Sequence, residues 1–330
     1  MSAPRVSVVM PVKNAGGFLD QAVRSILQQR FSDLELLLVD DHSVDGALEA
    51  LRVRDPRLLV LQSPGQGVVP AFNHGLDAAR GRLIARMDAD DVALPDRIGR
   101  QVSLLDSTDL AACGTAIQFF PRSELRGGNR RYERWLNSVT DSDLLHRQIF
   151  VECPIPNPTA MFRREALELL GGYRDTDWPE DYDLYLRADQ AGMRLGKVAE
   201  VLLRWRLHAD RLTITDERYS RSRFQAAKAH FLANGRLPQG PFMIWGAGPS
   251  GAEMYDLLLA EGRRASAFLE IHPRRVGGEK RGRPVYAFEQ APARSEFILV
   301  AVGSRGARDQ IRTFLQAAGK REGDDYLFAA

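Results

Sequence analysis

Short apolar runs alternate with helical patterns along the first part of the chain. Residues 6–10, 36–39, 58–61 and 83–87 are apolar almost throughout, which is typical of strands buried on both faces of a sheet. Between them, residues 18–27 and 67–79 carry apolar side chains at helical spacing. This alternation predicts an α/β fold whose sheet is mixed but mainly parallel.

The middle of the chain is less regular, and its last part restarts an α/β pattern. Residues 121–135 are polar, basic and glycine-containing and predict a mobile loop, whereas 181–191 and 216–234 predict helices. A proline- and glycine-rich segment at 238–241 marks a boundary. We therefore expect a domain at 1–212, a helix and linker at 213–240, and a small Rossmann-like domain at 241–330, in which strands at 242–245, 265–269 and 297–302 are joined by helices, the last at 305–318.

Length and composition limit the class of protein. A chain of 330 residues is long enough for two domains, and a formal net charge of +2 gives no strong attraction to nucleic acid. Cys113 and Cys153 have no metal-ligand spacing. No signal-peptide layout and no apolar run of about 20 residues is present, so we expect a cytoplasmic protein, with peripheral contact at the inner face of the membrane left open.

An acidic cluster follows the apolar run at 83–87. Asp88, Asp90 and Asp91 lie within four positions, and carboxylates that close repel one another. A hard divalent cation, Mn²⁺ or Mg²⁺, would relieve the repulsion and often keeps substrate phosphates as further ligands. The cluster therefore predicts a metal–diphosphate site. The alternative is an acidic turn that caps the helix beginning near residue 94.

Other polar residues follow neighbouring strands. Pro11 follows the first apolar run, and Asp40 and Asp41 follow the second. Ligands of α/β sheets bind beyond the carboxyl ends of the strands, so these residues should converge with the acidic cluster on one crevice. A carboxylate there can accept a hydrogen bond from a base or a ribose. The alternative is that these acids and Ser43 cap a helix N-terminus.

The ordered set of motifs resembles family-2 glycosyltransferases of the GT-A fold. The resemblance covers about residues 4–210 and is carried by residues 8–14, 39–46, 71–81, 84–91, 94–97, 171–174, 180–187 and 204–208, in the order of the family. It implies an inverting transfer of a sugar from a nucleotide-diphosphate sugar, with a UDP-sugar favoured. The implied acceptor is a glycan or lipid-linked glycan in bacterial surface polysaccharide synthesis.

The resemblance also implies roles for single residues. Asp181 would be the general base, with Glu180 beside it, since an inverting transfer needs one base and no covalent intermediate; the alternative for this pair is helix N-terminal charge. Asp90 and Asp88 would hold the metal, and His208 either reaches the metal, as in some relatives, or is structural. The donor site would comprise Pro11, Val12, Asn14, Asp40, Asp41, Asn73, Arg86 and Asp88.

One position departs from the family. Many relatives have Arg where this chain has Phe72, so a cation that would face the base or phosphate is missing there. Arg86, just before the acidic cluster, can compensate. The departure leaves the identity of the nucleotide open.

The C-terminal domain contains a second motif. Gly246, Gly248 and Gly251 form G-x-G-x-x-G between a predicted strand and helix, and Glu270 ends the next strand, as expected for a nucleotide site. The domain looks like the small domains that precede bacterial sugar-modifying acyltransferases. It either binds a nucleotide or nucleotide sugar, or serves as a dimerisation or docking unit. Alternative functions are a nicotinamide-dependent oxidoreductase and a non-catalytic nucleotide-sugar-binding protein.

A basic stretch remains outside both motifs. Residues 122–134 are rich in arginine, with Tyr132 and Trp135 interleaved. They can meet an anionic lipid or an acidic acceptor, or form a solvated loop.

Overall fold

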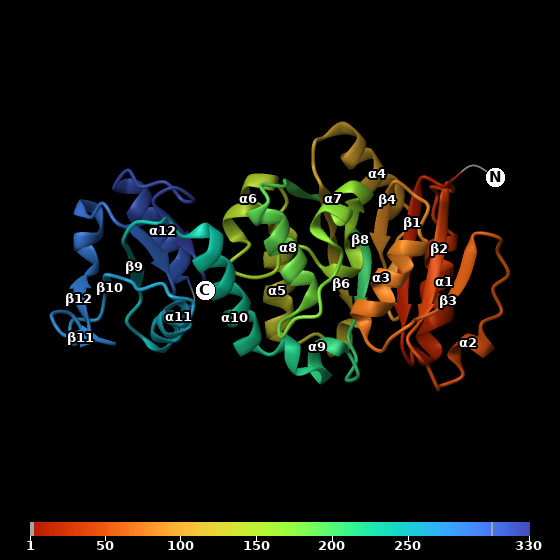
Figure 1. Ribbon diagram of the computed structural model, residues 1–330, viewed down its shortest axis with the longest axis horizontal. Helices are drawn as coiled ribbons and strands as arrows, with labels where there is room; N and C mark the ends of the chain where they lie inside the picture. Colours follow the sequence, from red (N-terminus) through yellow and green to blue (C-terminus); the bar gives the residue numbers. More distant parts are fainter. Residues whose placement is uncertain (1–2, 305) are drawn as a thin grey trace. The chain divides into compact units, whose positions relative to one another are not determined.

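The computed structural model describes residues 3–304 and 306–330 and divides into two compact units (Figure 1). The first comprises residues 1–146 and 154–215, and the second comprises residues 147–153 and 216–330. Each unit has its own sheet, as the two α/β patterns of the sequence predict.

The sheet of the first unit has the strand order β3-β2-β1-β4-β7-β6-β8-β5. Its strands are β1 (Val6–Val12), β2 (Leu34–Asp40), β3 (Leu58–Gln62), β4 (Leu83–Arg86), β5 (Val92–Ala93), β6 (Ala112–Phe120), β7 (Met161–Arg163) and β8 (Leu195–Arg206). Strands β1 to β4 are parallel, β7 is antiparallel to both β4 and β6, and β6 is parallel to β8. The mixed, mainly parallel sheet is thus confirmed, and β1, β2, β4 and β8 end at the same edge.

Helices cover this sheet and bury most of its strands. The edge strand β3 is an exception, because it is partly or largely exposed along its length, and the expectation that residues 58–61 are buried on both faces is wrong. The helices are α1 (Leu19–Leu27), α2 (Ala47–Ala50), α3 (Val68–Ala78), α4 (Arg97–Ser107), α5 (Gly127–Ser138), α6 (Ser142–Gln148), α7 (Arg164–Leu170), α8 (Glu180–Gln190) and α9 (Leu212–Thr215). Every residue of β2 is buried, which explains why its sequence is an apolar run rather than an alternating pattern. No helix of the described residues is long and apolar enough to cross a membrane.

The expectation of a loop at 121–135 is wrong. Residues 122–124 form a 3₁₀ turn and α5 follows from Gly127. Tyr132, Trp135 and Leu136 lie at helical spacing and turn toward the unit, and Leu136 is fully buried. The many arginines on the other face of the helix, together with two glycines in its first turn, obscured this short apolar stripe.

The second unit holds the order β11-β12-β10-β9-β13-β14. Its elements are α10 (Arg221–Phe231), β9 (Phe242–Trp245), α11 (Pro249–Ala260), β10 (Ala267–Glu270), β11 (Glu279–Lys280), β12 (Arg283–Ala287), β13 (Phe297–Val300), α12 (Ala307–Ala317) and β14 (Tyr326–Phe328). All neighbours are parallel except β11 and β12. The order reverses between β9 and β13, where open α/β sheets form a crevice. Arg305, the expected first residue of α12, lies outside the described residues.

Candidate active site

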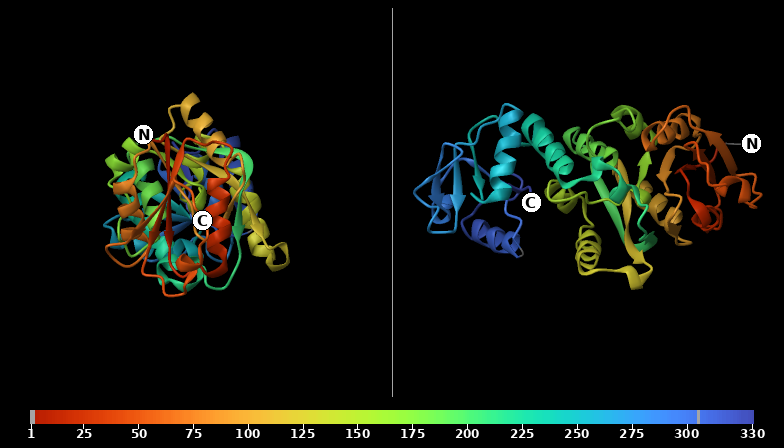
Figure 2. Two further views of the ribbon diagram at one scale, coloured as in Figure 1. Left: turned by 90° about the vertical axis from the view of Figure 1, so that its right-hand side faces the viewer. Right: turned by 90° about the horizontal axis from the view of Figure 1, so that it is seen from below.

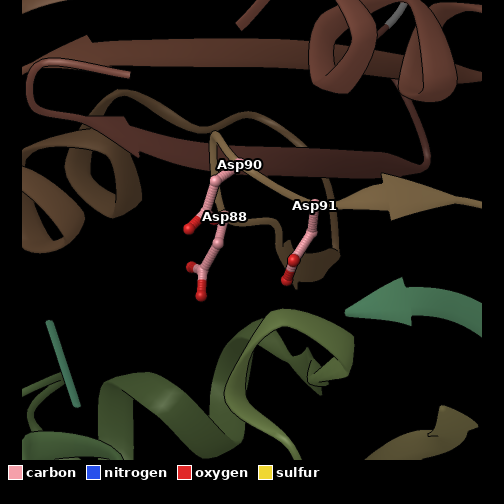
Figure 3. A group of neighbouring side chains, drawn as sticks. All are labelled: Asp88, Asp90 and Asp91. Atoms are coloured by element: carbon pink, nitrogen blue, oxygen red, sulfur yellow. The ribbon is translucent and has the colours of Figure 1, made fainter. Parts of the chain in front are cut away.

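The acidic cluster forms a turn directly after β4. Oxygen atoms of Asp88, Asp90 and Asp91 all lie within 4.8 Å of one another, and their side chains point to the same side of the turn (Figure 3). The start of the turn is bonded to β1, because Met87 N donates to Val9 O at 3.1 Å. The three carboxylates therefore converge on one point, an arrangement that could hold a cation.

Asp91 is the member that the sequence analysis did not assign to the site. It is fully buried, its Oδ1 accepts a hydrogen bond from Arg206 N at 2.7 Å, and its Oδ2 has no partner. Burial, followed by the charges of Asp90 and Asp88, raises the pKa of this carboxyl well above its usual range. A buried carboxyl oxygen without a partner needs one, and a hard cation between the three aspartates would supply it.

The end of β8 closes one side of the cluster. His208 Nε2 lies 2.7 Å from Asp90 Oδ2, and its Nδ1 is buried without a partner. The Arg206 guanidinium donates to Asp90 O at 2.6 Å and lies 4.3 Å from the ring centroid of Phe18 and 4.4 Å from that of Phe120. The structure thus brings His208 into contact with Asp90. The role of Arg206 depends on packing between distant segments, which a sequence pattern does not reveal.

Arg86 places a cation beside the cluster. Its side chain is 6% exposed and pairs with Asp88 at 2.7 Å, while its Nη1 is buried without a partner. The guanidinium lies 5.5 Å from the ring centroid of Phe72, and Phe72 stacks on Tyr173 at 4.3 Å. A cation is therefore present next to the position at which many relatives carry one, and it retains a free hydrogen-bond donor.

Glu180 and Asp181 form the first turn of α8. Burial, then the neighbouring charge of Glu180, with a smaller contribution from Asp88, raises the pKa of Asp181 to about 8. Residues further along α8 fix this first turn. Arg187 Nε donates to Asp183 Oδ2 at 2.6 Å, and Arg187 Nη2 donates to Gly172 O at 2.8 Å. The predicted base thus lies within the electrostatic reach of the acidic cluster, on a rigid helix end.

The acids after β2 do not cap a helix directly. Helix α2 begins only at Ala47, with Gly46 as its N-cap, so the capping alternative does not apply to Asp40 and Asp41. Instead, Asp40 Oδ1 accepts from Ser43 N at 3.0 Å. Asp41 accepts from Gly67 N at 2.9 Å and pairs with Lys13 at 3.2 Å. The two carboxylates shape the loops at the ends of β1 and β2.

Three further residues that were predicted for the donor site lie at the end of β1. Val12 is buried, and its carbonyl accepts from Asp41 N at 2.7 Å. Asn14 has φ +51°, and its side-chain oxygen accepts from Val44 N at 2.9 Å. Pro11, the next-to-last residue of β1, is partly exposed at the same sheet edge. The bonds of Val12 and Asn14 join the end of β1 to the loop after β2.

Asn73 has a structural role in addition to any contact with a donor. Its Nδ2 donates to Tyr173 O at 2.8 Å and its Oδ1 accepts from Tyr173 N at 3.0 Å. A Cβ on Gly172 would lie 2.7 Å from Asn73 Oδ1, so only glycine fits there. The amide therefore fastens α3 to the turn that precedes α8.

The glycine motif of the second unit lies between β9 and α11. A Cβ on Gly251 would lie 1.7 Å from Gly246 O, so this glycine permits the helix to pack closely on the strand. Gly248 is the N-cap of α11. Glu270 is buried, and bonds from Arg275 and the backbone of Ile271 and His272 outweigh the effect of burial and lower its pKa.

Comparisons with known proteins identify the family of the chain. Residues 7–171 match the model of glycosyl transferase family 2. The putative glycosyltransferase EpsE of Bacillus subtilis (strain 168) is 33% identical over 218 residues, which cover 63% of this chain and 75% of that protein. The O-antigen biosynthesis glycosyltransferase WbnJ of Escherichia coli is 29% identical over 209 residues, covering 62% of this chain and 80% of the relative. The chain therefore belongs to glycosyl transferase family 2 and is a glycosyltransferase.

The fold has solved counterparts. S. aureus TarS 1-349 in complex with UDP-GlcNAc superposes with a TM-score of 0.56 at 16% identity, covering 77% of this chain and 71% of that chain. A mannosyltransferase from Pyrobaculum calidifontis in complex with GDP-Man and Mn²⁺ gives a TM-score of 0.50 at 20% identity, covering 71% of this chain and 63% of that chain. At these identities the likeness concerns the fold alone.

Proposed function

We propose that the protein is a metal-dependent inverting glycosyltransferase that uses a nucleotide-diphosphate sugar, with a UDP-sugar favoured. The observation that carries the proposal is the convergence of Asp88, Asp90 and Asp91 within 4.8 Å, with a buried, unpartnered oxygen on Asp91. The proposed acceptor is a glycan or a lipid-linked glycan of a bacterial surface polysaccharide. The O-antigen relative supports this acceptor class, and the solved neighbours with UDP-GlcNAc and with GDP-Man support a nucleotide-sugar donor in general.

The metal would be held by Asp90, Asp88 and His208, with Asp91 as an additional oxygen donor. A bound Mn²⁺ or Mg²⁺ neutralises the charge that develops on the departing diphosphate. His208 would add a neutral imidazole nitrogen, and its ring already lies against Asp90. The carboxylate oxygens are the donors that Mn²⁺ and Mg²⁺ prefer.

Asp181 would remove the proton from the acceptor hydroxyl. As that oxygen attacks the anomeric carbon, a new C–O bond forms, the bond from the anomeric carbon to the diphosphate breaks, and the proton passes to the carboxylate. A base with a pKa of about 8 accepts this proton more readily than an ordinary carboxylate, because general-base catalysis is most efficient when the pKa lies near the working pH. Glu180 raises that pKa through its adjacent charge.

The loops after β1, β2 and β4 would bind the nucleotide-diphosphate sugar. Asp40 and Asp41 would accept hydrogen bonds from the base and ribose, above the floor formed by Pro11, Val12 and Asn14, with Asn73 beside them. Arg86 would donate from its unpartnered Nη1 to the sugar–diphosphate of the donor. It would thus supply the positive charge that Phe72 does not.

A thermal-shift panel tests the proposed donor site. UDP, GDP, CDP, dTDP and NAD(H) are each added with and without Mn²⁺ to the wild type and to Asp90→Asn. A ligand at 100 times its Kd stabilises the folded state by about 2.7 kcal/mol. We expect one nucleoside diphosphate to raise Tm only with Mn²⁺ and only in the wild type. A Mn²⁺-dependent shift of equal size in Asp90→Asn would overturn the metal assignment.

The second unit offers a second candidate function, the binding of a nucleotide at the reversal point between β9 and β13. The glycine motif lies there, with Gly248 at the start of α11 and Glu270 at the end of β10. If this site binds, the same panel shows a shift that Asp90→Asn retains and Gly248→Asp removes. Gly248 has an extended backbone that any residue adopts, and a Cβ would meet only Arg275 at 3.6 Å. Asp is also a good N-cap, so Gly248→Asp should fold while repelling a phosphate. Turnover with NAD(H) would favour the oxidoreductase alternative.

The raised pKa of Asp181 predicts how the stability of the metal-free protein depends on pH. The folded carboxyl titrates at about 8, whereas an unfolded Asp titrates near 3.9. Between these values the folded state binds more protons than the unfolded state, so this carboxyl lowers stability progressively as the pH rises toward 8, and fully above it. In EDTA, the Tm of Asp181→Asn should exceed that of the wild type by a margin that grows from pH 5 to pH 8 and then stays constant. Parallel Tm curves for the two proteins would contradict the assignment.

A further inference from the structure

Helix α5 carries a stripe of cations on its exposed face. Arg126, Arg130 and Arg134 lie one turn apart, Arg131 lies beside them, and all are exposed. None of these four forms an ion pair with an acid within the described residues. Glu133 on the same helix is already bound to Arg122 and to Phe119 N.

This stripe does not stabilise the helix. Like charges at i and i+4 repel, and the first of these arginines lie at the N-terminal end, where the helix dipole disfavours positive charge. Gly127 and Gly128 in the first turn are also poor helix formers. The exposed charges are therefore available to an anionic partner outside the chain.

The inner face of α5 joins the stripe to the start of α9. Tyr132 and Trp135 stack at 6.1 Å between ring centroids, and Tyr132 lies 6.5 Å from Trp205 on β8. The Arg211 guanidinium lies 4.8 Å from the ring centroid of Trp205, so α5 and the residue before α9 share one aromatic layer. In Figure 2, α5 (yellow) lies on the outside of its unit.

Exposed apolar side chains follow directly after Arg211. Leu212 is 43% exposed and Ile214 is 66% exposed. The α5 arginines and these two exposed apolar side chains, which are linked through the half-buried aromatic layer, are here called the α5–α9 surface. A soluble polyanion would contact only the arginines of this surface. An anionic bilayer would contact both parts, because cations meet headgroups while exposed apolar side chains enter the interfacial region.

We propose that the α5–α9 surface binds an anionic phospholipid bilayer. His208, beside Asp90, precedes Arg211 by only a few residues, so docking through this surface would hold the acidic cluster close to the headgroup layer. The consequence for acceptors carried in the membrane rests on the proposed function. The docking itself does not, because it needs neither metal nor donor.

Vesicle co-sedimentation tests the proposal with the full chain. Vesicles of phosphatidylcholine alone are compared with vesicles containing one quarter phosphatidylglycerol, without metal or nucleotide. The test variant is Arg130→Gln/Arg134→Gln. Its matched control is Arg52→Gln/Arg54→Gln, an exposed pair with the same charge change and no ion pair to an acid in the described part of the chain. Each arginine near an anionic membrane surface contributes enough binding free energy that losing two should weaken vesicle binding about 30-fold.

We expect the wild type and the control to bind only the anionic vesicles, and to lose binding at high salt. No difference between the two vesicle types, or equal binding by the test and control pairs, overturns the proposal. Leu212→Ser/Ile214→Ser and soluble dextran sulfate separate a bilayer from a polyanion. The serine pair should weaken vesicle binding and leave dextran sulfate binding unchanged; unchanged vesicle binding would assign the surface to a soluble polyanion instead. A retained Mn²⁺-dependent nucleotide shift in each variant shows that the donor site is intact.

Discussion

Asp181→Asn is expected to lower kcat by about 10²- to 10⁴-fold, the usual contribution of a general base, while the affinity for the donor stays unchanged. The amide has nearly the same shape as the carboxylate and keeps an oxygen for the bond from Tyr182 N. The amide cannot take up the proton of the hydroxyl group that attacks the sugar. Because Asp183 and Arg187 fix the helix end independently, the loss should concern chemistry rather than structure.

Steady-state transfer assays and donor titration measured on the same preparation separate these effects. Glu180→Gln is the matched comparison, since it makes the same chemical change one residue earlier. It should lower the pKa of Asp181 by removing the adjacent negative charge, and therefore shift the pH profile of kcat to lower pH. Loss of donor binding in Asp181→Asn would show that Asp181 is not the base, and abolished transfer in Glu180→Gln alone would move the role to Glu180.

The second large effect is expected at Asp90. Asp90→Asn should lower transfer by about three orders of magnitude, because a metal ion stabilises the charge on a leaving group by several kcal/mol. The fold should not suffer. Asn retains an oxygen for His208, and removing one of three carboxylates that lie within 4.8 Å of one another relieves repulsion. The metal-free Tm should therefore be equal to or higher than that of the wild type.

Mn²⁺ titration by calorimetry, together with transfer assays at saturating donor, measures this loss. Asp96→Asn is the control, because Asp96 lies on the same connection but pairs with Arg30 at an exposed site. It should leave both Mn²⁺ affinity and turnover unchanged. Near-normal turnover in Asp90→Asn would remove the metal from the mechanism.

The fold and the acidic cluster were predictable because their signals are local. The buried strands β1, β2 and β4 appear as apolar runs. Asp40 ends β2, Asp41 follows it, and the acidic cluster begins two residues after β4. Helix α5 was not predicted, because its apolar stripe is short and its remaining positions are mostly arginine, glycine and asparagine. A pattern of this kind resembles a loop until the helix is seen to pack on β6.

The less predictable part of the site depends on contacts between distant segments. Arg206 reaches the turn after β4 across more than one hundred residues. Asp91 is fully buried whereas Asp88 is partly exposed, a difference that their shared residue type does not reveal. Asn73 and Glu270 show the opposite case. Both were predicted as ligand contacts, and both already form hydrogen bonds within the chain. Residue type and spacing do not reveal such hydrogen bonds.

The turn at 88–91 is fixed at both ends and along its length. Met87 N bonds Val9 O, Leu94 N bonds Leu202 O, and Arg206 holds both Asp90 and Asp91. Because the turn is already ordered, little conformational entropy would be lost when an ion binds, and the three carboxylates are preorganised. The loops that would contact the sugar and the acceptor lie on other connections. On the proposed function, such a division makes the scaffold evolvable, since substitutions in those loops would change which sugar is transferred without disturbing the turn proposed to hold the metal.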